Sequence, residues 1–169
     1  MFNSIDDFLT LWKMESERTR TLFAKLTDEA LASTSFHPNV RSIRALSGHI
    51  IKTSKELLER TGLHVHSLDD DDPNPHTTQS LMQEFERMTK SVHDAVQTEW
   101  TDADLDKTDE MYGETWTRKQ SLFALITHLI HHRGGLTILM RLANLKVPGI
   151  YGPAKEEWVL YSMEPPVED

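Results

Sequence analysis

Four long segments of this chain carry apolar residues at the three- and four-residue spacing of an α-helix, and polar or proline-containing stretches separate them. Each helix of this kind has one apolar stripe, which it buries against other helices. The pattern predicts an all-α protein, and we expect a four-helix bundle of the up-and-down type in a single domain, residues 1–169. The predicted helices cover residues 4–26, 41–61, 78–100 and 117–143.

Signals at the ends of the first and last segments support this interpretation. Ser4 with Asp7 is a start signal for the first helix, and Thr117 with Gln120 forms a capping box before the last. Asn144 can adopt the left-handed conformation that ends a helix. The last segment therefore has both a start and a stop.

The connections between the helices differ in length. Residues 62–76 include four consecutive aspartates and two prolines, which prevent a packed helix there. This connection is long enough to cross a bundle, so the second and third helices need not be tight antiparallel neighbours. We expect an irregular stretch over residues 107–116, and a tail from Val147 onward that wraps the bundle and frays at its end.

Composition excludes several classes of function. The 169 residues include no cysteine, which rules out disulfides, thiolate metal ligands and a cysteine nucleophile. The 27 acidic and 18 basic residues give a net charge of -9 without a clustered basic face, so we expect no nucleic-acid binding. No apolar run is long enough for a membrane span and the first residues do not resemble a signal peptide, so we expect a cytoplasmic protein.

Three of the nine histidines lie on or beside apolar stripes. His128 and His132 are four residues apart, which places them on one helical face, and His49 lies at the edge of the stripe of the second helix. Burying imidazoles has a cost unless each finds a partner, and one metal ion would satisfy all three. Three protein ligands and one open position are typical of catalytic zinc. The alternative is a set of hydrogen-bonded core histidines.

The other histidines fit this pattern poorly. His131 points roughly 100° away from His132 at the helical period, so we expect it at the surface or behind the ligands. The histidines near the four aspartates are more simply explained by a solvated acidic loop. We assign no metal-binding role to His37, His64, His66, His76 and His93.

Two further polar side chains are candidates for the site. Glu15, with Ser16 and Thr19, interrupts the apolar face of the first helix, which indicates either a rim position or a polar cavity. Glu15 is then a candidate partner that faces the cavity. Arg133 can pair with a substrate carboxylate or with an acid of a neighbouring helix, and we favour the ion pair.

Motifs of other enzyme classes are missing from the sequence. The segment from His128 to His132 has leucine where a zincin has its catalytic glutamate. No Glu-x-x-His pair of a di-iron bundle occurs, and neither does a glycine-rich phosphate loop or a Gly-x-Ser-x-Gly elbow.

A second apolar strip runs along the last predicted helix, on the side opposite its leucines. A helix that is apolar on two sides is buried on two sides. We therefore expect a homodimer contact or a cover from the tail. The strip consists of Phe123, Ile126 and Ile130.

The chain resembles the DinB/YfiT-like family of metal-dependent enzymes over nearly its whole length. The resemblance rests on the segment Arg44-Ala-Leu-Ser-Gly-His49-Ile and on His128-Leu-Ile-His-His132-Arg133-Gly134. Arg141 and the segment from Val147 to Pro153 add support. Two positions depart from the family pattern, because Gly135 stands where the family often has Gln and Asn144 where it often has Gly.

The resemblance implies a commonly dimeric four-helix bundle with one divalent metal bound by His49, His128 and His132. Zn²⁺ or Ni²⁺ fits these ligands best, and Mn²⁺ or Fe²⁺ is also compatible. Several family members are thiol-dependent transferases or isomerases that use low-molecular-weight thiols. We therefore expect a thiol-dependent transferase or a metal-dependent hydrolase that acts on a small molecule.

Two alternatives remain open at this point. One is a non-enzymatic, stress-related bundle in which the metal is structural or the site binds a ligand. The other is histidine acid–base catalysis without a metal, which would proceed in the presence of a chelator. The sequence does not identify a catalytic residue.

Overall fold

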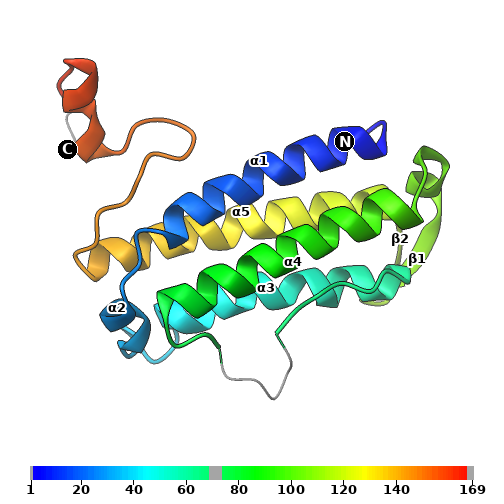
Figure 1. Cartoon of the computed structure of the whole chain (residues 1–169), viewed down its shortest axis with the longest axis horizontal. Helices are drawn as coiled ribbons and strands as arrows, with labels where there is room; N and C mark the ends of the chain where they lie inside the picture. Colours follow the sequence, from blue (N-terminus) through cyan, green and yellow to red (C-terminus); the bar gives the residue numbers. More distant parts are fainter. Residues whose placement is uncertain (1, 69–73, 167–169) are drawn as a thin grey trace.

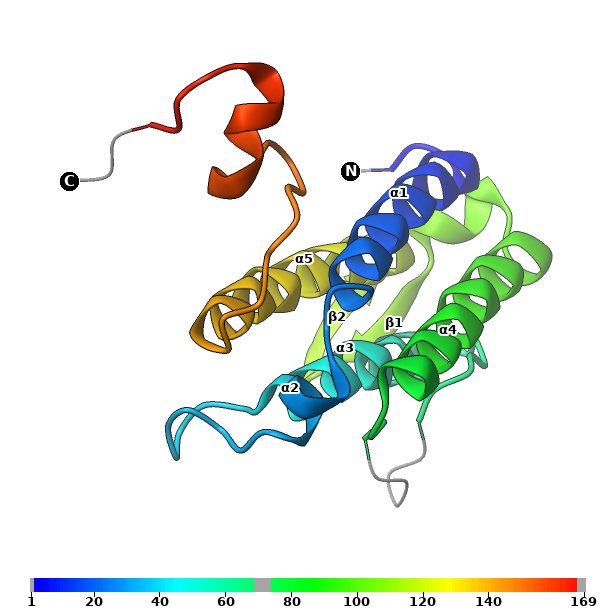
Figure 2. The same ribbon diagram turned by 60° about the vertical axis from the view of Figure 1, so that its left-hand side comes forward.

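The computed structural model of the chain describes residues 2–68 and 74–166, and it is mostly helical with one small two-stranded sheet. Four long helices lie side by side and enclose the core (Figures 1 and 2). Their positions confirm the four helical segments predicted from the apolar spacing. They are α1 (Ile5–Phe23), α3 (Ile43–Leu58), α4 (Thr78–Glu99) and α5 (Arg118–Leu142).

The predicted end signals act as expected. The Ser4 side chain accepts a hydrogen bond from the backbone N–H of Asp7, and the Asp7 side chain accepts from the backbone of Ser4 in return. Thr117 and Gln120 make the same reciprocal pair at the start of α5. Asn144 has φ 57°, the left-handed conformation expected where α5 ends.

Short helical elements join the long ones. A short α-helix follows α1, short 3₁₀ helices follow α3 and α4, and a further 3₁₀ helix lies in the C-terminal segment. They are α2 (Asp28–Ala32), η1 (Glu59–Thr61), η2 (Asp102–Asp106) and η3 (Lys155–Tyr161).

The stretch expected to be irregular before α5 is an antiparallel β-hairpin, so the all-α prediction was wrong at this point. Strand β1 (Thr108–Met111) pairs with β2 (Glu114–Thr117). The turn between them is Tyr112-Gly113, with φ of 53° and 85°. Two consecutive residues with positive φ are typical of a type I′ hairpin turn, for which Asn-Gly is the commonest sequence signal.

The helices do not alternate in direction along the chain, so the expected up-and-down order was also wrong. His76, just before α4, contacts Arg44 in the first turn of α3, whereas His66, just after α3, donates its backbone N–H to Ser91 in the second half of α4. α3 and α4 therefore run in the same direction (Figure 1). The long connection makes this possible, because at ~3.3 Å per residue it can return along a helix of about 30 Å.

Each long helix has two long neighbours. α1 packs against α4 and α5, and α3 packs against the same two helices from the other side (Figure 2). Aromatic rings join α1 to α4, where the centroids of Phe23 and Phe85 lie 5.1 Å apart. No helix within residues 2–68 and 74–166 is long and apolar enough to span a membrane.

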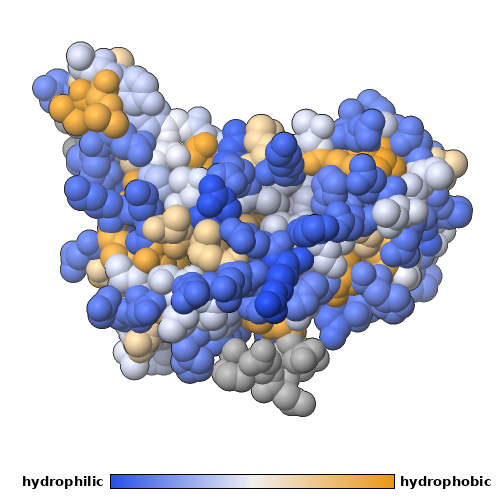
Figure 3. All heavy atoms as spheres, viewed as in Figure 1, coloured by the Kyte–Doolittle hydropathy of each residue, from blue (hydrophilic) through white to orange (hydrophobic). Residues whose placement is uncertain are grey.

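The C-terminal tail follows the bundle only part of the way. Val147 and Ala154 are buried, but no residue of η3 is, so the expectation that the tail wraps the bundle was wrong beyond Ala154. η3 is joined to the end of α5 by the ion pair between Glu156 and Arg141, and it otherwise projects from the bundle (Figure 1). Apolar side chains gather on this arm, at the upper left of Figure 3. The exposed ones include Val159, Leu160, Tyr161 and Met163.

The second apolar strip of α5 is only partly covered. Ile126 is buried in the core and Ile130 packs against it, whereas Phe123 remains 44% exposed. The expected cover of this strip by the tail therefore does not extend to Phe123. The homodimer contact stays a prediction.

Candidate metal centre

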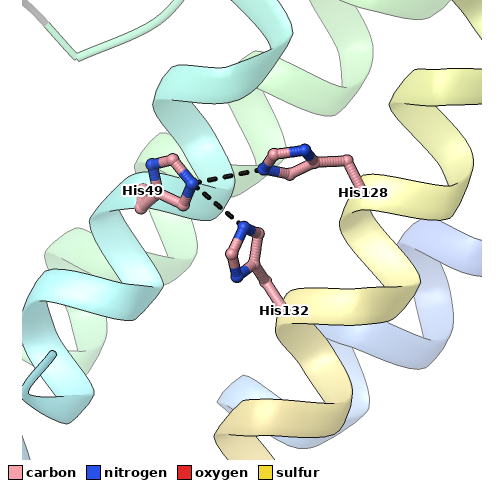
Figure 4. A group of neighbouring side chains, drawn as sticks. All are labelled: His49, His128 and His132. Carbon is pink, nitrogen blue, oxygen red and sulfur yellow. Dashed lines mark hydrogen bonds between the residues drawn. The ribbon is translucent and has the colours of Figure 1, made fainter. Parts of the chain in front are cut away.

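Two helices that pack against each other supply the three histidines predicted as ligands. His49 lies in the second turn of α3, and His128 and His132 lie one turn apart on the facing side of α5. Figure 4 shows the three rings pointing toward one another. Gly48 keeps this part of α3 narrow, because a side chain there would collide with Asn74 of the connection to α4.

The nitrogen atoms are close enough to share one ion. Nε2 of His49 lies 3.0 Å from Nε2 of His132 and 3.2 Å from Nε2 of His128. One ligand atom from each histidine fits within 4.8 Å of the others. Two nitrogens on a tetrahedral Zn²⁺ at about 2.0–2.1 Å lie about 3.3–3.4 Å apart. The observed separations fit such a centre.

Hydrogen bonding alone does not satisfy this cluster. The Nε2 of an imidazole carries either one proton or one lone pair, so it makes one good hydrogen bond in the ring plane. Nε2 of His49 faces both His128 and His132. A single cation between them uses the lone pairs of all three rings, which favours the metal over a set of hydrogen-bonded core histidines.

The surroundings keep the imidazoles neutral. Burial, together with the charges of His128, His49, His131 and Arg41, lowers the pKa of His132 to about 4. Burial and the charge of Arg41 also lower the pKa of His49, and burial lowers that of His128 although Glu56 opposes the shift. Because a metal ligand must be unprotonated, the three imidazoles can bind a cation near neutral pH without first losing protons.

His131 behaves as predicted from its angle on the helix. It is exposed, and although its ring centroid lies 4.9 Å from that of His132, it does not join the group of converging ligand atoms. The only group of this kind in the part of the chain that the structure describes is the one formed by His49, His128 and His132.

The remaining histidines lie elsewhere. The His66 ring contacts Glu84 at 2.7 Å, and that of His93 contacts Asp94. The four aspartates of the predicted acidic loop fall within residues 69–73, outside the described residues.

Glu15 is not a partner of the histidines, so its candidate role at the site was wrong. It is 2% exposed and accepts a 2.5 Å hydrogen bond from Arg133, which is also 2% exposed. Tyr151 of the tail bonds to both, and Arg18 pairs with Glu15 as well. Arg133 therefore makes the inter-helix ion pair that we favoured from the sequence, and it faces α1 rather than the histidines.

A cavity of about 610 Å³ opens beside His132. Its walls come from the segment before α3, from α3 and from the second half of α5. A volume of this size is typical of small-molecule sites. A second groove, of about 420 Å³, lies between α1 and α4 around Trp12 and Phe85, on the opposite side of the bundle from the histidines.

Sequence reasoning missed two charged neighbours of the centre. Arg41 was predicted as the first residue of the second helix, but it lies in the segment before α3 and lines the cavity. Glu56 accepts a hydrogen bond from Tyr112 at the hairpin turn, which the sequence did not predict. Burial and Glu56 together raise the pKa of Tyr112 to about 12.

Comparison with known proteins identifies the family of this chain. The family model described as "DinB family" matches residues 1–166. The chain belongs to the DinB family. This confirms the family predicted from the histidine motifs of the two helices, and the metal-dependent activity stays a prediction.

Relatives of this DinB protein match it over nearly their whole length. The uncharacterized protein YrdA of Bacillus subtilis (strain 168) is 34% identical over 166 residues, which cover 98% of this chain and 99% of YrdA. A DinB-like protein from Bacillus cereus ATCC 10987 has a similar crystal structure, with 34% identity, a TM-score of 0.83, and coverage of 89% of this chain and 100% of that one.

A third protein shares the fold alone. The DinB-like protein YjoA from Bacillus subtilis is 16% identical, with a TM-score of 0.65 over 85% of this chain and 97% of its own. The helical arrangement is thus retained at low sequence identity.

Proposed function

We propose that the protein is a metal-dependent enzyme of the DinB family, a thiol-dependent transferase or a hydrolase that acts on a small molecule. His49, His128 and His132 bind one divalent metal ion inside a four-helix bundle. The observation that carries the proposal is the convergence of three Nε2 atoms beside an open cavity. Three protein ligands that leave a coordination position free are typical of catalytic rather than structural zinc.

The donor set narrows the choice of metal. All three ligands are imidazole nitrogens, and among the described residues no carboxylate joins the group. Such a set suits Zn²⁺ or Ni²⁺, with Mn²⁺ or Fe²⁺ also compatible, and it disfavours Mg²⁺ and Ca²⁺, which take oxygen ligands. A bound ion of this kind supplies a Lewis acid that lowers the pKa of a water or thiol next to it.

The residues of the chain hold and shape this centre. The one-turn spacing on α5 fixes His128 and His132 relative to each other, and α3 brings His49 against them. Leu46 and Leu139 form buried apolar walls of the adjoining cavity. Apolar walls limit the water around a bound substrate, which strengthens electrostatic interactions within the site.

A thiol is the co-substrate that best fits the chain. The protein has no cysteine of its own, so any sulfur nucleophile must enter with a small molecule. We propose a low-molecular-weight thiol in this role, in the cytoplasm. A homodimer contact through the second apolar strip of α5 (Phe123, Ile126 and Ile130) completes the proposal. A monomeric mass by light scattering at micromolar concentration would contradict this contact.

The enzymatic proposal is tested by turnover with and without metal. Protein stripped with a chelator and reloaded with Zn²⁺ or Ni²⁺ is assayed with a small thiol plus an aromatic halide, and with activated esters. We expect turnover only in the reloaded protein, its loss in His132→Ala, and its retention in the control His93→Ala, which changes a histidine on α4. Tight metal binding without turnover on either substrate class would favour the non-enzymatic alternative.

A further inference from the structure

The cavity beside His132 has one charged wall. Arg41 and Asn39 lie in the segment that precedes α3, across the cavity from the second half of α5. Among the described residues that line the cavity, Arg41 is the only Lys, Arg, Asp or Glu, in a chain whose net charge is -9. The cavity is therefore locally basic in an acidic protein.

The guanidinium of Arg41 is not committed to another group. Arg41 is exposed, and within residues 2–68 and 74–166 it makes no hydrogen bond and no ion pair. Arg133 differs in this respect, because Glu15, Thr19 and Tyr151 surround its buried guanidinium. Of the two arginines, Arg41 is the one that can reach an incoming ligand.

Arg41 also lies near the metal ligands. Its positive charge contributes to the low pKa values of His49, His128 and His132. His132 lines the same cavity as Arg41. A molecule that enters between the α3 segment and α5 would meet the guanidinium and the histidine centre together.

The rest of the cavity is apolar. Val40 and Ile138 are 43% and 63% exposed, and the buried side chains of Leu46 and Leu139 line the same cavity. Gly135 of α5 has no side chain, and a Cβ built on it would lie 3.7 Å from the Leu46 side chain of α3. The lining fits an organic molecule with an apolar portion better than a bare inorganic anion.

We infer that Arg41 is a specificity-determining residue, which binds a carboxylate on the small organic substrate that reaches the histidine centre. The inference rests on the proposed function, since it concerns the same site. A guanidinium presents a planar fork of N–H donors that matches a carboxylate. The substrate class is thus a small carboxylic acid with an apolar segment, held by Arg41 at one end and near His132 at the other.

The test uses the protein loaded with Co²⁺, because a thiolate bound to Co²⁺ absorbs in the near ultraviolet. The two probes are 3-mercaptopropionate and its uncharged methyl ester, which carry the same thiol and differ in the carboxylate. We expect the parent protein to bind the acid about fivefold more tightly than the ester, as for an ion pair that is open to solvent. Arg41→Gln should remove this preference, and Arg41→Lys should keep part of it.

A matched control lies on another helix. Arg87→Gln removes an exposed arginine of α4 that pairs with Glu84, and it should leave the preference unchanged. Equal affinity of the parent protein for acid and ester would overturn the role of Arg41 while the metal centre stands. If neither thiol changes the spectrum, the open metal position itself is wrong, and the inference falls with the proposed function.

Discussion

His132 has its pKa lowered to about 4 by burial and by the positive charges of its neighbours, and His49 and His128 are shifted in the same direction. These shifts disfavour the imidazolium form, so a cation does not have to displace a proton at neutral pH. The same shifts lower the stability of the folded protein at lower pH, because the unfolded chain takes up protons that the folded chain does not.

We predict that the metal-free protein loses stability as the pH falls from about 6.5 to about 4. In this window His132 is protonated in the unfolded chain but neutral in the folded protein, so protons favour the unfolded state. Above about pH 6.5 His132 is neutral in both states and no longer affects the free energy of unfolding. Urea unfolding across this range should show a steeper loss for the parent than for His132→Gln. Parallel curves for the two proteins would contradict the lowered pKa.

At the scale of single elements, α1 and α5 are joined by a buried ion pair. Glu15 and Arg133 are 118 positions apart in sequence, and both are 2% exposed. Burial raises the pKa of the Glu15 carboxyl, but hydrogen bonds from Arg133 and Tyr151 outweigh it and hold that pKa below its usual value. The pair thus fixes the face that α5 turns toward α1, and with it the face about 100° further around the helix that carries His132.

Glu15→Ala should destabilise the fold by about 3–5 kcal/mol, because it leaves the charge of Arg133 buried and unpaired. Chemical denaturation measures this change. Glu17→Ala is the matched control, since Glu17 pairs with Arg20 on the exposed face of the same helix and should cost at most about 1 kcal/mol. Adding Arg133→Met to Glu15→Ala should restore part of the stability, and a double variant as unstable as Glu15→Ala would argue against an unpaired charge as the cause.

For Gly134, one of two glycines inside α5, we expect a substitution to stabilise the protein rather than to destabilise it. Gly134 is exposed, and a Cβ built on it would meet nothing within 4 Å. Gly134→Ala should therefore stabilise the protein by roughly 0.5–1 kcal/mol through helix propensity, seen as a higher midpoint of thermal unfolding. A clear loss of stability would mean that another surface packs closely on this position.

What the sequence could predict at this scale depended on local signals. The capped helices could be predicted because the hydrogen bonds of Ser4 and Thr117 reach only three residues along the chain. The hairpin was missed because its strands have four residues each and its turn is Tyr-Gly rather than Asn-Gly. The pairing of Glu15 with Arg133 was not predicted, because the two residues are 118 positions apart and no local pattern links them.

At the scale of the whole molecule, the order and direction of the helices decide which side chains meet. The sequence predicted that His128 and His132 share a face, which follows from the helical period, and proposed His49 as their partner. It did not predict that α3 and α4 run in the same direction, because the long connection allows either arrangement. Arg41 was missed for a related reason, since only the packing of the segment before α3 against α5 brings it to the cavity.

Removal of the metal should also lower the stability of the whole fold. Because the ligands come from α3 and α5, an ion bound only by the folded protein stabilises that state. We expect the midpoint of thermal unfolding to fall when a chelator is added to the parent protein, and to stay unchanged in His132→Ala.

The metal content of the purified protein is the most direct test of whether His49, His128 and His132 bind a metal ion. The parent, His49→Ala and His131→Ala would be purified without a metal-affinity column and analysed for zinc, nickel, manganese and iron. We expect about one equivalent of metal in the parent and in His131→Ala, and little in His49→Ala. A parent that holds no metal even after Zn²⁺ and Ni²⁺ are added, or three proteins with the same metal content, would contradict it.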